Sequence, residues 1–515
     1  MNYRFNKKSL LLLFMLLIAI ALSLVSFINI FYLFPTSSIT PKTTEHEFIQ
    51  LLDQRVKLLM EKYAIPGVNI AIIRQGKILW AHAYGYADKE KGIPMKLETI
   101  CRVESISKSV TAWGILKLVE HGAISLDDQV VKHLKTWKFP PSSFHPETIT
   151  IRQLLSHSAG LPLGTIGVRY APNDAIPTLQ ESLYKDAVMM TSPGSIFSYS
   201  NTGFNLLELI IEEVTNQPFA EYMQREILQP LSMKHSSYKW SNNFEPFPNG
   251  YTLDGKPIPA YVYPEKGAGG LFSTVEDITR FVTAGMTTFN NTGLKVLSLK
   301  SIQTLYEPTV KIPSPYGLAF PWYGLGHFIE FSKNNIKAVS HGGQGTGWMT
   351  HFHSIPETGD GIVMLTNSQR SWPFFAHILN DWAKWIGFDS VGMSKIIYAE
   401  IALWIIIYII SITLMVYFYG IIKGLLLKTR TCVFIQKKFC ARGMLQLFAG
   451  ITLFAIVVWA MNQDYMFITS VFPKAAPWLG YIIFTSGLVF LAYFFFPINE
   501  RFKKHQYLFL KKNLT

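Results

Sequence analysis

Four long apolar runs constrain this chain more than any other feature of its sequence. They span residues 10–34, 401–422, 444–461 and 478–497, and none contains Asp, Glu, Lys or Arg. A helix needs roughly 20 apolar residues to cross a bilayer, so each run predicts a transmembrane helix. The first run extends beyond the usual apolar region of a signal peptide. We favour a retained anchor there, with a cleaved signal peptide as the alternative.

The net charge of +13 is concentrated beside these runs. The basic residues concerned are Arg4, Lys7, Lys8, Lys423, Lys428, Arg430, Lys437, Lys438, Arg442, Arg501, Lys503, Lys504, Lys511 and Lys512. Lys and Arg next to membrane spans mark the cytoplasmic side. The distribution therefore predicts a multi-pass protein of the cell membrane with both termini in the cytoplasm. It gives no support to a nucleic-acid partner.

The same pattern predicts the division of the chain into segments. A cytoplasmic tail (1–9), an anchor (10–34) and a linker (35–44) precede an extracytoplasmic domain (45–390). Three transmembrane helices (398–422, 444–461, 478–497) follow, with a basic cytoplasmic loop (423–443) and tail (498–515). Cys101 is the only cysteine of the outer domain, so no disulfide can form within it. About 350 residues are enough for an ordinary hydrophobic core.

Hydrophobic periodicity predicts an α+β fold for the outer domain. Residues 67–87 alternate as two strands that turn at Gln75-Gly76, and strands return at 316–320, 322–331, 337–355 and 361–367. Helical spacing fills the middle, at 105–122, in a short helix from 150 that ends at Gly160, after a loop within 192–215, and after a cap within 269–282. A helix at 376–387 closes the domain. This order predicts an antiparallel sheet built from both ends of the domain, flanked by helices and a helical insertion.

Ser105 precedes Lys108 by three residues at the start of one predicted helix. Residues three apart share a helix face, so the hydroxyl and the amine can touch. A desolvated lysine can take the proton of a serine and make it nucleophilic. The spacing alone is weak evidence, because Ser182 with Lys185 and Ser236 with Lys239 also fit it.

Two further short motifs give this pair a context. They are Tyr199-Ser200-Asn201 and His341-Gly342-Gly343, the only Tyr-x-Asn and His-x-Gly of the chain. Together the three motifs resemble the S-x-x-K, S-D-N and K-T-G set of class A β-lactamases and penicillin-binding proteins. Tyr-x-Asn resembles the class C branch, and His-x-Gly resembles its esterase and peptidase relatives. Longer blocks such as RVESISKSVTAWGILKLVEHGAISLDDQV, PGSIFSYSNTGFNLLELIIEEVT and SHGGQGTG extend the resemblance over most of residues 45–370.

The resemblance implies a β-lactamase/transpeptidase-like fold and a set of roles. Ser105 would attack an acyl carbon, and Lys108 would accept its proton. Tyr199 would relay that proton to the leaving group or, as a phenolate, share the role of base. Asn201 would bind Lys108 or an amide oxygen of the substrate. No metal or cofactor is implied.

The resemblance also implies an oxyanion site. Its donors would be the backbone N–H groups of Ser105 and Gln344. Gln344 directly follows His341-Gly342-Gly343, and Gly343 would let the strand approach the substrate closely. His341 stands where relatives with Lys-Thr-Gly carry a cation. Since histidine is mostly neutral at pH 7, we expect poor binding of a free carboxylate here.

A purely structural role is the alternative for each of these residues. Ser105 and Asn201 could cap helices, Lys108 could be solvated, Tyr199 could bond the backbone, and His341 could be a core histidine. His157 is interpreted as structural. His351 and His353 alternate like a metal pair, but the sequence offers no third ligand, so they are also interpreted as structural.

The combined reading is a membrane-anchored extracytoplasmic serine hydrolase that forms an acyl-enzyme. Its expected partners are the lipid bilayer and a peptide or ester of D-amino acids in the cell envelope. One alternative is a catalytically silent binding or sensor module, and another is a true β-lactamase. A transporter is disfavoured, because no apolar run carries a charge. The oligomeric state leaves no signal in the sequence.

Overall fold

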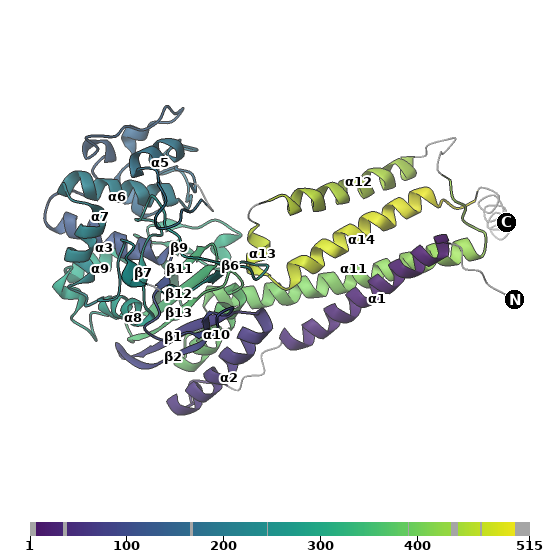
Figure 1. Ribbon diagram of the computed structural model, residues 1–515, viewed down its shortest axis with the longest axis horizontal. Helices are drawn as coiled ribbons and strands as arrows, with labels where there is room; N and C mark the ends of the chain where they lie inside the picture. Colours follow the sequence, from purple (N-terminus) through teal and green to yellow (C-terminus); the bar gives the residue numbers. More distant parts are fainter. Residues whose placement is uncertain are drawn as a thin grey trace. The chain divides into compact units, whose positions relative to one another are not determined.

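The computed structural model describes residues 7–33, 39–164, 168–244, 246–389, 391–433, 441–463 and 466–499. The chain divides into two compact units, one made of Met1–Thr36 with Ile397–Thr515 and one made of Ser37–Ile396 (Figure 1). The predictions for the extreme tails and for most of the basic loop after Val433 fall outside the described residues.

A nine-stranded antiparallel sheet forms the centre of the Ser37–Ile396 unit. Its order is β3-β2-β1-β13-β12-β11-β10-β9-β8. The strands are β1 (Gly67–Arg74), β2 (Lys77–Asp88), β3 (Ile93–Pro94), β8 (Val310–Lys311), β9 (Trp322–Tyr323), β10 (Phe328–Phe331), β11 (Lys337–Gly345), β12 (Trp348–Ile355) and β13 (Asp360–Thr366). Short pairs outside it are β4 (Cys101–Arg102) with β7 (Phe272–Ser273), and β5 (Gly250–Tyr251) with β6 (Pro257–Ile258).

Strands from the two ends of the unit meet in this sheet. β1 pairs with β13, so that Val68 lies opposite Thr366, and β1 also pairs with β2 through the predicted turn at Gln75-Gly76. The segment between β3 and β8 carries most of the helices. The predicted α+β architecture, with a sheet made from both chain ends and a helical insertion, is therefore confirmed.

Helices cover both faces of the sheet (Figure 1). The helices of this unit are α2 (Glu45–Tyr63), α3 (Ile106–Glu120), α4 (Ile151–Leu155), α5 (Leu179–Asp186), α6 (Asn201–Thr215), α7 (Phe219–Met223), α8 (Val275–Ala284), α9 (Leu299–Leu305) and α10 (Trp372–Ile386). Short turns of 3-10 helix fall at Val130–Lys132, Pro146–Thr148, Asn242–Phe244, Gly293–Lys295, Tyr316–Leu318 and Gly392–Ser394, and a π-helical turn at Gln224–Leu228.

The alternation of side chains along β1 explains the two layers. Ala71 and Ile73 belong to the core that includes α3 and α8, whereas the equally buried Ile70 and Ile72 point to the opposite face. On that opposite side α2 and α10 pack together, with Phe48 stacked on Trp385 at 4.1 Å. Because the sheet is covered on both faces, β12 and β13 are buried along their whole length.

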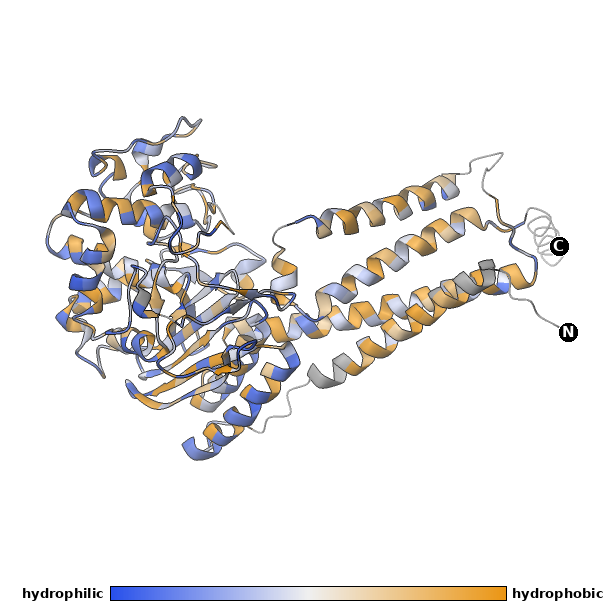
Figure 2. Ribbon diagram, in the orientation of Figure 1, coloured by the Kyte–Doolittle hydropathy of each residue, from blue (hydrophilic) through white to orange (hydrophobic). Residues whose placement is uncertain are grey.

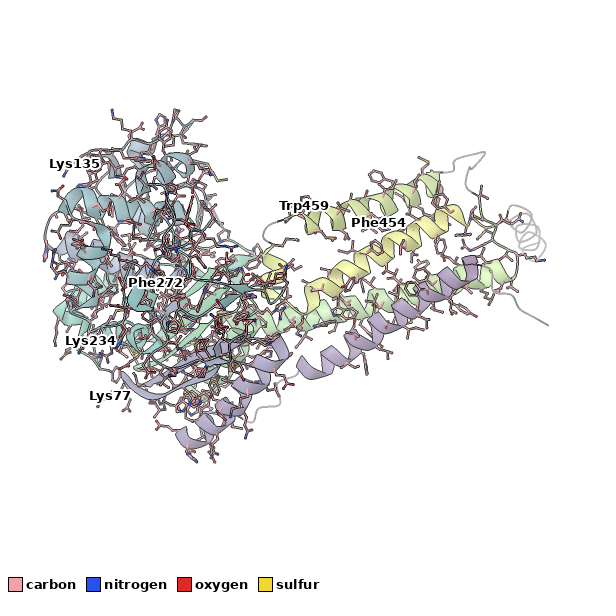
Figure 3. The ribbon with its side chains drawn as sticks, in the orientation of Figure 1. Lys77, Lys135, Lys234, Phe272, Phe454 and Trp459 are labelled. Atoms are coloured by element: carbon pink, nitrogen blue, oxygen red, sulfur yellow. The ribbon has the colours of Figure 1, made fainter. Side chains whose placement is uncertain are left out.

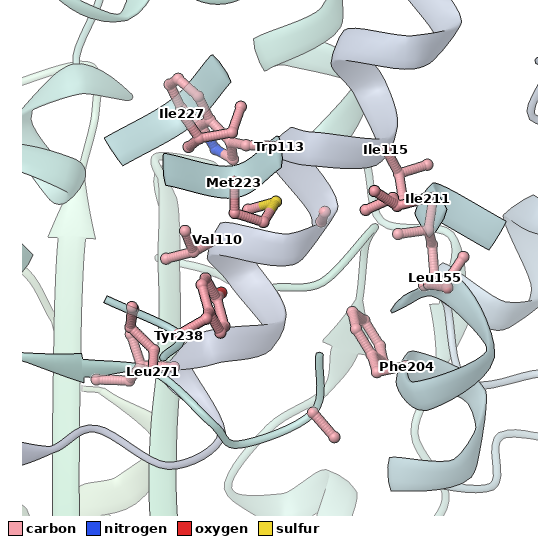
Figure 4. Close-up of a cluster of buried hydrophobic side chains, with 14 of the residues drawn as sticks. Val110, Trp113, Ile115, Leu155, Phe204, Ile211, Met223, Ile227, Tyr238 and Leu271 are labelled. Atoms are coloured by element: carbon pink, nitrogen blue, oxygen red, sulfur yellow. The ribbon is translucent and has the colours of Figure 1, made fainter. Parts of the chain in front are cut away.

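Helix α3 lies at the centre of the main core and is buried on almost every side. Figure 4 shows Val110, Trp113 and Ile115 of α3 surrounded by side chains of other elements, including Leu155, Phe204, Ile211 and Met223. Most of the buried side chains of α3 are apolar, and the buried Ser107, Lys108, Ser109 and Thr111 lie among them. In Figure 3 Phe272 likewise lies inside the unit, while the exposed Lys77, Lys135 and Lys234 lie at its rim.

The other unit consists of apolar helices (Figure 2). They are α1 (Lys7–Leu33), α11 (Lys395–Leu426), α12 (Ala441–Met461), α13 (Phe467–Val471) and α14 (Ala475–Phe495). Among the described residues, Gly392–Leu426, Ala441–Met461 and Ala475–Phe495 are long and apolar enough to cross a membrane, and Leu16–Ile28 is a shorter apolar helical segment. Gly450 of α12 packs against Gly487 of α14, which lets these two backbones approach closely.

One predicted strand is wrong. Residues 316–320 form a 3-10 turn over Tyr316–Leu318 instead of a strand, although Tyr316 and Phe320 are typical strand residues. The aromatic rings of Tyr316, Phe320 and Phe328 pack on one another, so the apolar pattern records burial rather than an extended backbone.

We expect Met223→Ala to destabilise the Ser37–Ile396 unit by about 2–5 kcal/mol, because this fully buried side chain packs on Gly114 of α3 and would leave a cavity. Met190→Ala is the matched control, since 64% of Met190 is exposed and its loss should change the free energy of unfolding by less than about 0.5 kcal/mol. Thermal or denaturant unfolding of the full-length protein in detergent measures both. Equal effects of the two substitutions would contradict the assignment of Met223 to the core.

Candidate active site

Ser105 lies at the N-terminus of α3 and does not act as its cap. Its side chain makes no capping hydrogen bond, whereas the N-cap residues Thr44 and Thr150 of α2 and α4 do. The alternative in which Ser105 serves only to cap a helix is therefore wrong. The hydroxyl is instead within hydrogen-bond distance of the Lys108 amine, at 3.0 Å.

Lys108 is fully buried, so its interpretation as a solvated surface lysine is also wrong. Its amine lies 2.7 Å from Oδ1 of Asn201, 2.8 Å from the carbonyl oxygen of Ala268 and 3.0 Å from Oγ of Ser105. Asn201 begins α6, and Ala268 lies in the turn before β7, so two separate elements hold the amine in place.

Burial lowers the pKa of Lys108 to about 7, although the Glu104 carboxylate acts in the opposite direction. A neutral amine has two hydrogens and one lone pair. The oxygens of Asn201 and Ala268 can only accept, so they take the two hydrogens. The lone pair is then left for the hydroxyl hydrogen of Ser105, which is the arrangement of a general base beside a nucleophile.

Tyr199 lies beside the same two groups. The Lys108 amine is 5.0 Å from the centre of its ring. Burial raises the pKa of Tyr199, and a hydrogen bond with Ser105 only partly offsets this effect. The phenol therefore stays protonated at neutral pH, which favours a role in passing on a proton over a role as a phenolate base.

The Tyr199-Ser200-Asn201 motif is fixed by hydrogen bonds at Ser200. Ser200 caps α6, because its hydroxyl accepts from the Gly203 N–H and donates to Pro162 O. The suggestion that Asn201 caps this helix is therefore wrong, and its side chain is directed to Lys108. His157 accepts a hydrogen bond from the Ser200 N–H, and its ring lies 4.2 Å from that of Tyr199. This contact fits the structural role predicted for His157.

His341 is fully buried on β11, and both of its ring nitrogens have partners. Nδ1 lies 2.8 Å from Gly342 O, which can only accept, and Nε2 lies 3.0 Å from the Tyr323 hydroxyl. Nδ1 therefore carries the hydrogen, and Nε2 accepts from Tyr323. Burial and the nearby Lys108 charge lower the pKa of His341 well below its usual value, so the ring is neutral.

Gly343 and Gln344 lie on β11 next to the segment that precedes Ser105. A Cβ atom on Gly343 would clash with Val103 O, so glycine is required for this close approach. The side chain of Gln344 accepts a hydrogen bond from the Trp372 indole at 2.9 Å. The structure thus brings all seven predicted site residues into one region around Ser105.

The two competing Ser-x-x-Lys pairs lie in other surroundings. The Ser182 hydroxyl bonds to Glu265, and Lys185 is exposed. Ser236 bonds to Asp277 at 2.8 Å, and Lys239 is exposed. The structure therefore separates Ser105 from these serines by the burial of its lysine.

Sequence reasoning missed several groups that complete the site. The Ala268 carbonyl holds Lys108, Tyr323 holds His341, and Thr350 donates to Val103 O beneath Ser105. Ala268 directly precedes the segment 269–282, which is recognised by its helical spacing, and that spacing says nothing about a carbonyl. Nothing in the sequence distinguished Tyr323 or Thr350 from ordinary strand residues.

Comparison with known proteins places this geometry in context. Residues 52–382 match the sequence profile of the Beta-lactamase family. Protein flp of Staphylococcus aureus (strain N315) is 29% identical over 325 residues, which cover 62% of this chain and 63% of that protein. The chain thus spans less than two thirds of this relative. The putative penicillin-binding protein PbpX of Bacillus subtilis (strain 168) is 28% identical over 319 residues, covering 59% of this chain and 75% of PbpX.

Two solved structures have a similar fold. The octameric penicillin-binding protein homologue from Pyrococcus abyssi superposes with a TM-score of 0.58 at 30% identity, covering 69% of this chain and 81% of that one. A penicillin-binding protein from Bacillus halodurans gives 0.50 at 24% identity, covering 61% and 94% respectively, and supports the fold alone.

We expect covalent labelling of Ser105 by a fluorophosphonate to accelerate as the pH rises through about 7, because the reactive form requires neutral Lys108. Lys108→Ala should slow labelling by roughly 10²–10⁴-fold and remove this rise. Lys185 is the exposed lysine of the competing pair Ser182 and Lys185, so Lys185→Ala should leave the pH dependence of labelling unchanged. A flat wild-type profile between pH 5 and 9 would contradict Lys108 as the base.

Proposed function

This chain belongs to the beta-lactamase family, and we propose that it is a membrane-anchored serine hydrolase that forms an acyl-enzyme on Ser105. The observation that carries the proposal is the position of the Lys108 amine. It is fully buried, its pKa is lowered to about 7, and two acceptor-only oxygens direct its lone pair to the Ser105 hydroxyl. Such a group can act as a general base at neutral pH.

In the acylation step Lys108 removes the hydroxyl proton while Ser105 Oγ attacks the acyl carbon. The carbonyl oxygen becomes an oxyanion, for which we propose the backbone N–H groups of Ser105 and Gln344 as donors. The N-terminal end of α3 adds a favourable dipole at the same place. The proton moves from Lys108 to the leaving group through the Tyr199 hydroxyl, which remains a phenol at neutral pH. Water then releases the acyl group by the reverse sequence.

The neutral state of His341 supports a preference for substrates without a free carboxylate next to the reacting bond. Both ring nitrogens already have partners, and burial keeps the ring uncharged. A carboxylate brought to β11 would lose its hydration without gaining a cation there. We therefore propose amides and esters of D-amino acids from the cell envelope as substrates, ahead of penicillins and of peptides that end in D-Ala-D-Ala.

We also propose that the Ser37–Ile396 unit lies outside the cell and that both termini lie in the cytoplasm. Three described helices have the length and composition of membrane spans. The basic residues near 423–443 and at the ends of the chain support this orientation through the preference of Lys and Arg for the cytoplasmic side.

Two matched substrates test the chemistry and the preference together. We expect the full-length protein in detergent to hydrolyse an N-acyl-D-alanyl-D-alaninamide faster than the corresponding N-acyl-D-alanyl-D-alanine, which differs only in its free carboxylate. Product formation measured by chromatography, with intact mass to detect the acyl adduct, gives both rates.

Ser105→Ala should abolish turnover and the adduct. Faster cleavage of the acid, or efficient turnover of benzylpenicillin, would contradict the substrate preference. Wild-type protein that gives neither adduct nor product with amides, D-alanyl esters, short acyl esters and penicillin would overturn the hydrolase and favour a binding module.

The orientation can be tested with the protein's own thiols. Cys432 is partly exposed and follows α11, while Cys101 is buried. A membrane-impermeant maleimide should label the wild type only after the cells are permeabilised, and Cys432→Ser with Cys440→Ser should remove that signal. A Lys77→Cys variant of this double mutant should be labelled on intact cells, since Lys77 is exposed at the β1–β2 turn. Labelling of wild-type Cys432 on intact cells would reverse the proposed topology.

A further inference from the structure

Glu104, directly before Ser105, has an unusual backbone and an unusual environment. Its φ is +50°, a left-handed conformation that residues other than glycine rarely adopt. Its carboxylate is buried and accepts hydrogen bonds from Arg102 Nε at 2.8 Å, from the Tyr261 hydroxyl at 2.9 Å and from the Tyr263 hydroxyl at 3.2 Å. A buried carboxylate with three donors is held in one position.

Arg102 makes this buried charge tolerable. Its guanidinium is also buried, pairs with Glu104, and donates to Tyr261 O at 2.7 Å and to Gly269 O at 3.2 Å. The rings of Tyr261 and Tyr263 lie 4.2 and 4.4 Å from it. The ion pair is thus embedded in an aromatic box, and removal of either charge would leave the other without compensation.

The carboxylate also touches β11, the strand opposite the nucleophile. A Cβ atom on Gly345 would clash with the carboxyl group of Glu104, and one on Gly343 would approach Glu104 Cβ and clash with Val103 O. The single hydrogen of the Tyr261 hydroxyl is shared between Glu104 and the carbonyl oxygen of Thr346, the residue after β11, which lies 3.0 Å away. The two glycines on either side of Gln344 therefore rest on residues 103 and 104.

We propose that Glu104 is a positioning residue for the oxyanion site. The two N–H donors of that site, on Ser105 and Gln344, belong to two segments that are distant in sequence. The buried Glu104 side chain lies between these segments and sets the distance between the donors. The left-handed turn at Glu104 presents the Ser105 N–H, while the carboxylate fixes β11 through its packing on Gly345 and through Tyr261. This inference rests on the proposed acyl-enzyme chemistry of Ser105.

The charge of Glu104 has a second effect that provides an independent readout. Glu104 raises the pKa of Lys108 against the larger effect of burial. Replacement of the carboxylate by a neutral amide removes this effect. It leaves the Arg102 cation, which lowers the pKa of Lys108 as burial does. The pKa of Lys108 should therefore fall. The pH at which the rate of Ser105 labelling rises should then move to a lower value.

The experiment compares Glu104→Gln with the wild type as full-length protein in detergent. The rate of fluorophosphonate labelling of Ser105 is followed between pH 5 and 9, as a first-order constant that does not depend on the fraction of folded protein. We expect the plateau rate above the midpoint, where Lys108 is already neutral, to fall by about 10-fold or more, because misplaced oxyanion donors weaken the transition state. The midpoint should also move to lower pH.

Two further variants keep the result interpretable. Glu357→Gln makes the same chemical change at an exposed position in the turn after β12 and should change neither quantity. Tyr263→Phe removes one hydrogen bond to Glu104 and keeps its charge, so the plateau should fall a few-fold while the midpoint stays in place. If Glu104→Gln does not fold, Tyr263→Phe decides, and an unchanged plateau in it overturns the proposal.

The plateau rate separates the remaining outcomes. A Glu104→Gln plateau within about twofold of the wild type overturns the positioning role, whatever the midpoint does. If such a plateau is found while wild-type turnover depends on Ser105, the positioning role of Glu104 is wrong and the proposed hydrolase function stands. Wild-type protein in which Ser105 neither turns over substrate nor reacts with the probe would overturn both.

Discussion

The burial of one amine is the condition on which the site depends. Lys108 lies on α3, which the core surrounds on almost every side, and the loss of hydration lowers its pKa into the neutral range. A buried amine remains tolerable only if its hydrogens find acceptors, and these come from Asn201 on α6 and from Ala268 before β7. The packing of α3, α6 and the turn before β7 therefore also sets the position of the Lys108 amine beside Ser105.

A second buried group stabilises the turn that carries Ala268. The Glu208 carboxylate of α6 accepts from the backbone N–H groups of Lys266 and Gly267, at 2.5 and 2.6 Å, and burial raises its pKa to about 7. The Gly267 carbonyl in turn accepts from Thr111 of α3 at 2.9 Å. This turn is thus bonded to α6 on its N–H side and to α3 on its carbonyl side, which connects the two helices that supply Lys108 and Asn201.

Local sequence patterns explain why most of the sheet and most of the candidate site residues were predictable from the sequence. Ser105 and Lys108 are three residues apart on one helix, and Tyr199 and Asn201 belong to a motif that occurs once. The strands of the sheet alternate strongly enough to be recognised, whereas Tyr316–Leu318 was misassigned because a short aromatic stretch can be buried without being extended. Ala268 acts through a backbone carbonyl, which no side-chain pattern marks. Glu104 acts through contacts with Tyr261 and Gly345, which are distant in sequence.

The pairing of β1 with β13 has a consequence for how this protein is made. β1 and β2 are synthesised early, but the strand that lies beside β1 in the finished sheet ends only at Thr366. Until then the hairpin exposes a hydrogen-bonding edge rich in Val and Ile, which is the kind of edge that invites aggregation. Completion of the domain as far as Thr366 therefore covers an edge that the hairpin alone would leave exposed.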